Sequence, residues 1–260
     1  MKGWHRMDRE TYIHGYSEAV VHEMQSRTVE AFAGFLIPHL ASGFSLLDCG
    51  CGPGTVTAGF RAYLGGGKLV GVDISEEQIK IANESVVDDV NTEFKVADVY
   101  KLPFDDSTFD VVFSHTLLEH VSSPVDALIE MKRVLKPGGL IATKNGDRGG
   151  QVPIVDSPNL DRAFRLHTEM AAEGGSDMDI GRRQHSYVLS AGFEQVSSTT
   201  STHFYDAEGV KDRFAALARG WCLQVFEVGR LTEDEFEMCL REIDHLESDP
   251  SGHVNLAVYW

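Results

Sequence analysis

Short apolar runs alternate with amphipathic stretches between residues 44 and 144. The apolar runs have the length of buried strands and lie at Leu46-Leu47, Lys68–Asp73, Phe94–Ala97, Phe109–Ser114 and Leu140–Thr143. Between them, apolar residues recur every three or four positions, as on one face of a helix; examples are Ile79, Ala82 and Val86, and Val125, Leu128 and Ile129. This alternation predicts an open α/β domain with a mostly parallel sheet.

Boundary signals support the predicted helices. Ser75-Glu-Glu-Gln78 is a capping box at the start of one helix, and Ser123-Pro124 is typical of the start of another. Lys136-Pro-Gly-Gly139 indicates where the second helix ends.

A glycine turn follows the first strand, in the sequence Asp48-Cys-Gly-Cys-Gly-Pro-Gly54. Glycines let the backbone bend sharply and approach a ligand where a Cβ would collide. Thr55 begins a helix, so free N–H groups are expected to face the turn. The Gly-Lys-Ser/Thr ending of a P-loop is absent, and the glycine spacing differs from the Gly-x-Gly-x-x-Gly of dinucleotide-binding folds.

Two further acids follow strands. Asp73 comes after the second strand, where a carboxylate can accept two hydrogen bonds from a ribose diol. Its charge would repel a 2′-phosphate, which argues against NADP. Asp98 follows the third strand and is placed to accept from an adenine amine.

These motifs occur in a specific order, with Leu-Pro-Phe-Asp-Asp-Ser-Thr-Phe-Asp, Leu-Leu-Glu-His-Val and Leu-Lys-Pro-Gly-Gly after the acids. In that order they resemble class I S-adenosylmethionine (SAM)-dependent methyltransferases, most closely the branch of the ubiquinone and menaquinone biosynthesis methyltransferases and their small-molecule relatives. The resemblance is strong over about residues 44–144 and looser at Tyr187–Thr199, which fits a last helix and sixth strand. It implies a Rossmann-like, seven-stranded, mostly parallel sheet with helices on both faces, an antiparallel last strand and helical substrate caps.

The resemblance also implies roles for individual residues in binding SAM. Asp48, Gly50, Cys51, Gly52 and Gly54 would face the methionine part. Asp73 would bind the ribose, and the adenine would contact Ile74, Gln78, Ala97, Asp98 and Val99. Ser114 and His115 would lie beside the sulfonium. Tyr16 and Arg27 would contact the cofactor from an N-terminal lid, and Arg27 would pair with the carboxylate of the cofactor.

We expect one structural domain with three parts. Residues 1–42 would form a helical lid, residues 43–204 the SAM-binding core with a cap insert at about 145–186, and residues 205–260 a helical cap and closing strand at Val254–Tyr259. Candidate substrate contacts are Asn145 and Asp147 after the fifth strand, Arg182 in the insert and Trp221 in the cap. Surface exposure, local ion pairing and core packing are alternative explanations for these side chains.

Methyl transfer requires mainly that a nucleophile be held in line with the methyl carbon. An oxygen or carbon nucleophile must also lose a proton, which a histidine can accept. His115 and then His167 are the candidate bases; for His115, the alternative is a residue that contacts the cofactor or starts a helix and has no role in proton transfer.

Composition limits the partners. The chain of 260 residues carries 40 acidic and 23 basic side chains, a net charge of −17, which argues against nucleic-acid substrates. No apolar run approaches a membrane span and no signal core is seen, so we expect a cytoplasmic protein without membrane insertion, either a monomer or a homodimer. The four cysteines indicate neither a disulfide framework nor a metal site.

The predicted function is methyl transfer from SAM to a small-molecule acceptor, with S-adenosylhomocysteine (SAH) as product. Two alternatives stay open: a non-methyl-transfer reaction on the same fold, and a non-catalytic SAM-binding protein. An NAD-dependent oxidoreductase would instead predict nicotinamide binding and no affinity for SAH.

Overall fold

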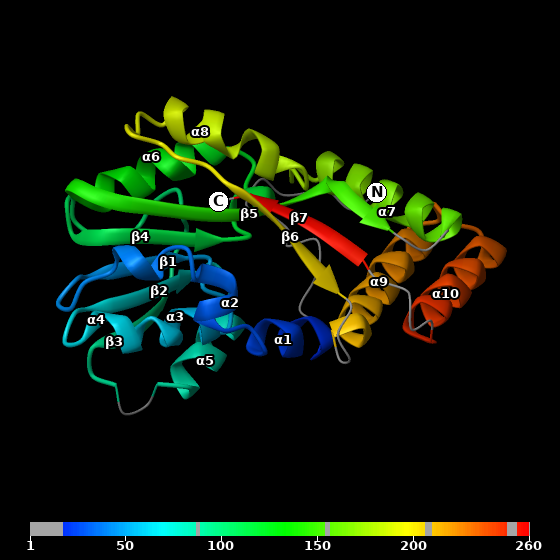
Figure 1. Ribbon diagram of the computed structural model, residues 1–260, viewed down its shortest axis with the longest axis horizontal. Helices are drawn as coiled ribbons and strands as arrows, with labels where there is room; N and C mark the ends of the chain where they lie inside the picture. Colours follow the sequence, from blue (N-terminus) through cyan, green and yellow to red (C-terminus); the bar gives the residue numbers. More distant parts are fainter. Residues whose placement is uncertain (1–17, 87–88, 154–156, 206–209, 249–253, 260) are drawn as a thin grey trace, which may run out of the picture.

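The computed structural model describes residues 18–86, 89–153, 157–205, 210–248 and 254–259. The strands are β1 (Leu46–Cys49), β2 (Leu69–Asp73), β3 (Thr92–Val96), β4 (Phe109–His115), β5 (Leu135–Pro153), β6 (Thr200–Tyr205) and β7 (Val254–Tyr259). Within the described residues they form one sheet in the order β3-β2-β1-β4-β5-β7-β6 (Figure 1). Strands β1 to β5 pair in parallel, and β7 is antiparallel to both β5 and β6. The predicted α/β, Rossmann-like class is therefore confirmed.

Helices cover both faces of the sheet. The helices of the core are α2 (Val29–Ala33), α3 (Thr55–Gly59), α4 (Arg61–Leu64), α5 (Glu76–Glu84), α6 (Pro124–Val134) and α8 (Gln184–Ser190). On one face α2, α3 and α4 pack around Phe60 and Phe113, which are fully buried. On the other face α6 and α8 pack around Leu128 and Met131.

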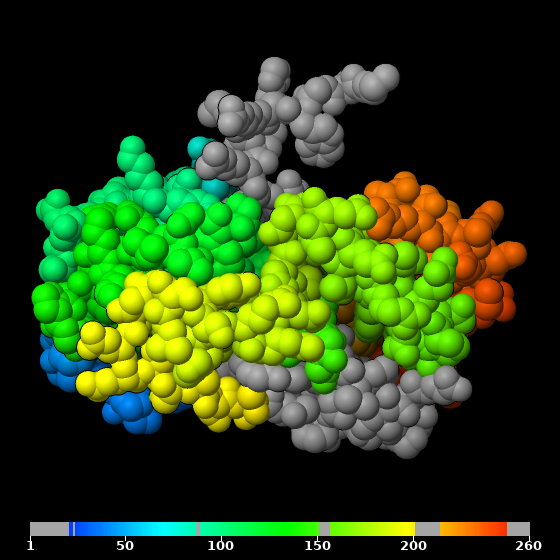
Figure 2. Space-filling model, turned by 90° about the horizontal axis from the view of Figure 1, so that it is seen from above, coloured from blue at the N-terminus to red at the C-terminus, as the bar shows by residue number. Residues whose placement is uncertain are grey.

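Three helices form a cap beyond the sheet: α7 (Pro158–Glu173), α9 (Val210–Glu227) and α10 (Glu233–Ser248). They share an apolar core that includes Leu160, Cys222 and Ile243. Figure 2 shows α7 and the orange α10 together at one end of the molecule. The short helix α1 (Glu18–Gln25) lies between the core and α9 (Figure 1).

Several predicted boundaries need correction. Apolar residues continue at helical spacing from Val20 to Phe35, which favours one helix in the N-terminal segment. The structure instead has two helices, α1 and α2, and the side chain of Thr28 accepts the N–H of Ala31 as the N-cap of α2. The sixth strand begins at Thr200, after the predicted range. Ser123 precedes α6 but makes no capping bond with its side chain. Three 3₁₀ turns also occur in the described chain: η1 (Ile37–His39), η2 (Leu118–His120) and η3 (Ile180–Arg183).

Two capping boxes behave differently. At the start of α10, the N–H of Thr232 donates to the Glu235 carboxylate and the N–H of Glu235 donates to the Thr232 hydroxyl, which completes a capping box. At α5, Ser75 accepts the N–H of Gln78 at 3.3 Å, but the Gln78 amide does not return a bond. The N–H of Ser75 instead donates to Asp73, which leaves Gln78 buried beside the sheet.

Candidate active site

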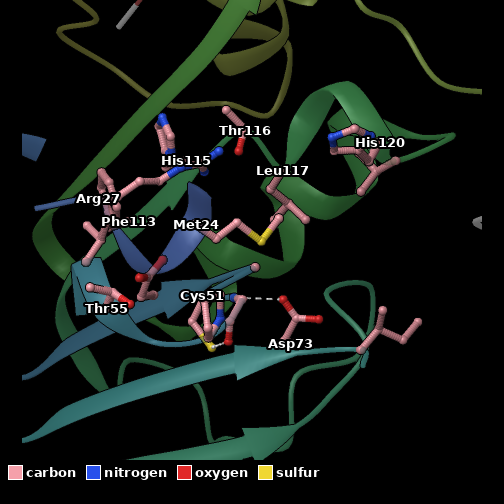
Figure 3. A pocket seen from close by; sticks show the side chains of 17 residues that line it. Met24, Arg27, Cys51, Thr55, Asp73, Phe113, His115, Thr116, Leu117 and His120 are labelled. Carbon is pink, nitrogen blue, oxygen red and sulfur yellow. Dashed lines mark hydrogen bonds between the residues drawn. The ribbon is translucent and has the colours of Figure 1, made fainter. Parts of the chain in front are cut away.

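A pocket opens at the carboxyl ends of β1, β2 and β4. Its empty volume, which includes solvent at the mouth, is about 890 Å³, within the usual range for a small-molecule site. Seventeen residues line it (Figure 3): Met24, Arg27, Asp48, Gly50, Cys51, Gly52, Pro53, Thr55, Val56, Asp73, Ile74, Phe113, His115, Thr116, Leu117, His120 and Val121.

The glycine turn forms one wall of this pocket. Gly50, Gly52 and Gly54 have φ angles of 75°, 53° and 79°, which favour glycine. A Cβ on Gly54 would lie 2.7 Å from the Phe94 ring, so the turn also packs closely against β3. The glycines are therefore required by both the bend and the packing behind it.

Asp73 links the turn to the second strand. Its carboxylate accepts the N–H of Gly52 at 2.9 Å, drawn as a dashed line in Figure 3. It also accepts the N–H of Ser75 at 2.9 Å. Burial raises the pKa of Asp73, although these bonds oppose the shift. Each carboxylate oxygen has a second lone pair, so the side chain can still accept bonds from a ligand in the pocket.

Asp48 is the second buried acid of the pocket. It accepts a hydrogen bond of 2.5 Å from the hydroxyl of Thr57, and burial raises its pKa to about 7. A positively charged ligand would favour its ionised form. Burial likewise raises the pKa of the Cys51 thiol well above its usual range, which disfavours a thiolate nucleophile.

The end of β4 forms the opposite wall. Phe113 and His115 point to the pocket face, and Thr116 has a φ of 51°, an uncommon value for a residue other than glycine. Its N–H donates to the carbonyl of Lys144 at 2.8 Å, which fixes the bend. Ser114, between Phe113 and His115, is fully buried, and its hydroxyl has no hydrogen-bond partner among the described residues.

The segment between α1 and α2 covers part of the pocket mouth. Met24 lies against the glycine turn, with its sulfur 3.8 Å from a Cβ placed on Gly52. Arg27 stacks 5.3 Å from the centroid of the Phe32 ring, and His115 meets the same ring edge-on. Tyr16 lies outside the described residues.

Strand β5 continues past the core and presents two different faces. Asn145 accepts from the N–H of Leu118 and donates to Gln184 at 2.8 Å, while Asp147 binds both arms of Arg182 at 2.8 and 2.5 Å. These contacts lie on the side of η3 and α8. The predicted substrate residues Asn145, Asp147 and Arg182 therefore hold the insert to the sheet, and none of them lines the pocket.

His167 and Trp221 lie inside the cap. Arg148 donates to His167 Nδ1 at 2.7 Å, so the other ring nitrogen carries the proton and donates to Gln224 at 2.9 Å. Burial and the charge of Arg148 lower the pKa of His167 to about 3. Arg148 also stacks 4.5 Å from the Trp221 ring. Neither His167 nor Trp221 lines the pocket.

Of the residues predicted to contact adenine, only Ile74 lines the pocket. Ile74 lines the pocket and is 60% exposed, as expected of a side chain that covers a ligand. Ala97, Asp98, Val99 and Gln78 lie beyond the lining set, and Asp98 accepts the N–H of Tyr100. Within the described ranges, the buried Gln78 amide nitrogen and oxygen have no hydrogen-bond partner.

The pocket thus brings together Arg27, Asp48, the turn residues 50–52, Asp73, Ile74 and His115. Sequence reasoning missed the pocket roles of Met24, Thr116, Leu117 and Val121, and it treated His120 as structural. The motif Leu-Leu-Glu-His-Val could have indicated that His120 lines the pocket, since it places this residue on the short turn η2 that follows β4. For Met24 and Thr116 the sequence carries no comparable signal.

The comparisons with known proteins agree with this geometry. Residues 47–143 match the family described as a methyltransferase domain. An uncharacterized methyltransferase of Schizosaccharomyces pombe is 36% identical over 205 residues, which are 75% of this chain and 73% of the relative. The 27-O-demethylrifamycin SV methyltransferase of Amycolatopsis mediterranei is 30% identical over 95% of this chain and 89% of its own length.

The chain belongs to the class I SAM-dependent methyltransferases. A Bacillus halodurans protein described as a methyltransferase shares the fold, with a TM-score of 0.57 at 17% identity over 92% of this chain and 97% of that one. The resemblance seen in the sequence is therefore confirmed, and so are methyltransferase activity and SAM as the cofactor.

The pocket residues fit this cofactor. A cationic ligand with ribose hydroxyls needs acceptors beside an open backbone, and the buried Asp48 and the half-buried Asp73 supply them beside the glycine turn. Among the described residues no group of three or more potential metal ligands occurs. Nor does any described helix combine the length and apolarity needed to cross a bilayer.

Proposed function

We propose that this methyltransferase transfers the methyl group to a small-molecule acceptor and releases SAH. The observation that carries the proposal is the pocket itself, which places the acids Asp48 and Asp73 at the glycine turn and has His115 in its lining at the end of β4. The Amycolatopsis relative, named for a demethylated rifamycin, aligns over 95% of this chain, which includes the cap segments. An acceptor of the natural-product class is consistent with that alignment.

We assign a binding role to each residue from its position in or beside the pocket. The turn residues and Asp48 would face the methionine part, Asp73 the ribose and Ile74 the adenine. Gln78, Ala97, Asp98 and Val99 would surround the adenine edge, and Arg27 would pair with the cofactor carboxylate. Residues 1–42 would act as a lid and residues 205–260 as part of the acceptor chamber.

Bound SAM supplies an activated methyl group on a sulfonium. The chain then has to hold the acceptor in line and exclude water, which supplies most of the acceleration. His115 is placed to contact the reacting region, because it lies in the pocket where β4 ends. Ser114 lies next to it in the chain, and its buried hydroxyl has no partner within the part of the chain that the structure describes.

The variant His115→Ala tests whether this side chain acts on the methyl acceptor. We expect turnover to fall by about tenfold or more while SAM affinity changes little, since the side chain would act on the acceptor rather than on the cofactor. Calorimetry gives the affinity, and single-turnover assays with mass spectrometry give the rate. An equal loss of both would show that His115 only supports the cofactor.

The proposal as a whole is tested by titration with SAM and SAH, followed by incubation with a broad set of small molecules. Methylated products detected by mass spectrometry support it. SAM binding without any methylated product would favour a non-methyl-transfer reaction or a binding protein. Binding of a nicotinamide cofactor without SAH binding would contradict the proposal.

A further inference from the structure

The Phe32 ring contacts side chains from three other parts of the chain. The His115 ring meets it edge-on, with the two ring centroids 5.3 Å apart. The Lys144 ammonium lies 5.4 Å from the centroid of the Phe32 ring, and the Arg27 guanidinium lies 5.3 Å from it. His115 belongs to β4 and Lys144 to β5, whereas Arg27 belongs to the segment between α1 and α2. One aromatic ring therefore connects this segment to two strands of the sheet.

Several contacts fix the Phe32 ring relative to the sheet. Phe32 lies on α2, and the next residue, Ala33, is fully buried in the core. His115 and Lys144 are partners in the register of β4 and β5. The Lys144 ammonium also donates to the carbonyl of Ala31 at 3.4 Å, which ties α2 to β5. The ring therefore offers a fixed surface to the more exposed Arg27.

Arg27 brings its charge to the pocket from outside the sheet. Its side chain lines the pocket and is half-buried, and the two residues before it are exposed. Arg27 also acts on Glu119, an acid outside the pocket lining; burial raises the pKa of Glu119 to about 7, and the charges of Arg148 and Arg27 oppose this shift.

The Phe32 ring lowers the cost of using Arg27 for ligand binding. A long side chain loses conformational entropy when a ligand fixes it. A guanidinium that already stacks on a ring loses less, because part of its freedom has been given up before the ligand arrives. Phe32 itself does not line the pocket, so any effect that it has on a ligand passes through the side chains it holds.

The position of Arg27 corresponds to one part of the cofactor. In Figure 3, Arg27 and Thr55 lie on one side of the pocket and Asp73 lies on the other. With Asp73 at the ribose, the side of Arg27 is left for the methionine part, which carries a carboxylate. A guanidinium and a carboxylate form a strong charge-assisted pair. A cofactor without this carboxylate would leave its ammonium near a like charge.

We propose that Phe32 is a positioning residue that holds Arg27 in the orientation that binds the cofactor carboxylate, so that the two residues together select SAM over decarboxylated SAM. This inference rests on the proposed function and adds a determinant of cofactor selectivity to the same site. The contacts of Phe32 with β4 and β5 keep Arg27 in place relative to the strands that form the pocket.

The test compares two ligands that differ by one group, SAH and decarboxylated SAH. Arg27→Met removes the charge, Phe32→Leu removes the ring but keeps an apolar side chain, and Phe32→Tyr keeps the ring. Phe44→Leu is the matched control, since Phe44 is also half-buried, precedes β1 and does not line the pocket. Calorimetry by competition measures both affinities, and circular dichroism checks folding. The ratio of the two affinities is compared within one preparation, so partial unfolding of a variant does not affect it.

We expect the natural protein to bind SAH about tenfold to a hundredfold more tightly than decarboxylated SAH, which lacks one charge-assisted contact. Arg27→Met should remove most of this preference. Phe32→Leu should weaken SAH binding by about threefold to tenfold, the range of a cation–π contact, and should change the affinity for decarboxylated SAH by less than about twofold. Phe32→Tyr should restore SAH binding, and Phe44→Leu should change neither affinity.

A double-mutant cycle tests whether the ring acts through Arg27. In the Arg27→Met background, Phe32→Leu should weaken SAH binding little further, because the side chain that the ring holds is gone. If Phe32 had only a structural role, the two losses would add.

Three results would overturn the inference while SAH still binds. They are an equal loss of both ligands in Phe32→Leu, additive losses in the double variant, and a loss of SAH binding in Phe32→Leu no larger than in Phe44→Leu. If Arg27→Met keeps the natural preference for SAH, the carboxylate role of Arg27 fails and the inference fails with it. If the natural protein binds neither ligand, the proposed function itself fails.

Discussion

The carboxylate of Asp73 accepts two backbone N–H groups, one from the glycine turn and one from the start of α5. The sequence predicted an acid at this strand end from its position alone. It could not predict that the same side chain also holds the turn in place, since this depends on how close residue 52 comes to residue 73. The side chain therefore contributes both to ligand contact and to the shape of the pocket.

Replacing this acid should affect both contributions. Asp73→Ala is expected to weaken SAM binding by about tenfold to a hundredfold, because the variant loses acceptors for the ribose and frees the N–H of Gly52. Calorimetry with SAM and SAH measures the change. Asp126→Ala removes an exposed acid from α6 and serves as the control. Unchanged affinity in Asp73→Ala would remove the ribose role.

Glu119 gives a pH-dependent prediction. Its pKa is raised from 4.5 to about 7, so the folded state binds its proton more tightly than the unfolded state. The stability that this provides is present below pH 4.5 and is lost as the pH rises through 7. Glu119→Gln, which is neutral at every pH, should therefore gain stability relative to the natural protein above pH 7 and differ little below pH 4.5.

Urea unfolding between pH 4 and 8.5 measures this difference. The unfolding free energies of the two proteins should diverge as the pH increases. A constant difference across the range would show that Glu119 keeps its ordinary pKa in the folded protein. Asp126→Asn on α6 is the matched control, since that residue is exposed.

The elements around the site show what a sequence can and cannot predict. The strand starting at Leu46, the helix start at Thr55 and the helix around His167 follow from apolar spacing and turn residues, and the structure has them in those places. The break between α1 and α2 was not predicted, because the apolar stripe continues through it while the Thr28 cap depends on local geometry. The position of Thr116 in the pocket wall also depends on a backbone bend that its residue type does not predict.

The start of α3 offers a test of element packing. Gly54→Ala adds a Cβ at a φ of 79°, 2.7 Å from Phe94 and 2.8 Å from Ala82. We expect a loss of about 2–4 kcal/mol in the free energy of unfolding, together with weaker SAM binding, because the turn has to shift. Gly66→Ala, where no atom lies within 4 Å of the added group, should change stability little. Equal effects of the two changes in urea unfolding would contradict this account.

At the scale of the whole molecule, the alternation of strands and helices predicted the core but not the contacts of the caps. Three residues expected to contact substrate, Asn145, Asp147 and Arg182, bond to other parts of the chain, and their acceptor role stays a prediction. Such pairings join positions about 35 to 40 residues apart, and the sequence of one chain gives no measure of which charged groups meet.

The large negative charge predicts a response to salt. Because like charges repel in the compact state, NaCl should raise the unfolding temperature by a few degrees between low and molar concentration. The increase should largely disappear at pH 5, close to the isoelectric point of about 5.0. Differential scanning calorimetry measures both series. A flat salt curve at pH 7 would show that the surface charges do not limit stability.

The length of β5 has a consequence for recombining this enzyme with its relatives. One continuous strand carries Lys144 at the sheet and Arg148 against the Trp221 ring of α9, so β5 connects the sheet to the cap without a break. A chimera joined at residue 145 would pair a foreign strand end with the native Trp221 and His167, or the reverse. Exchange of acceptor preference is therefore expected only when the donor segment includes β5 to its end together with α7 and α9.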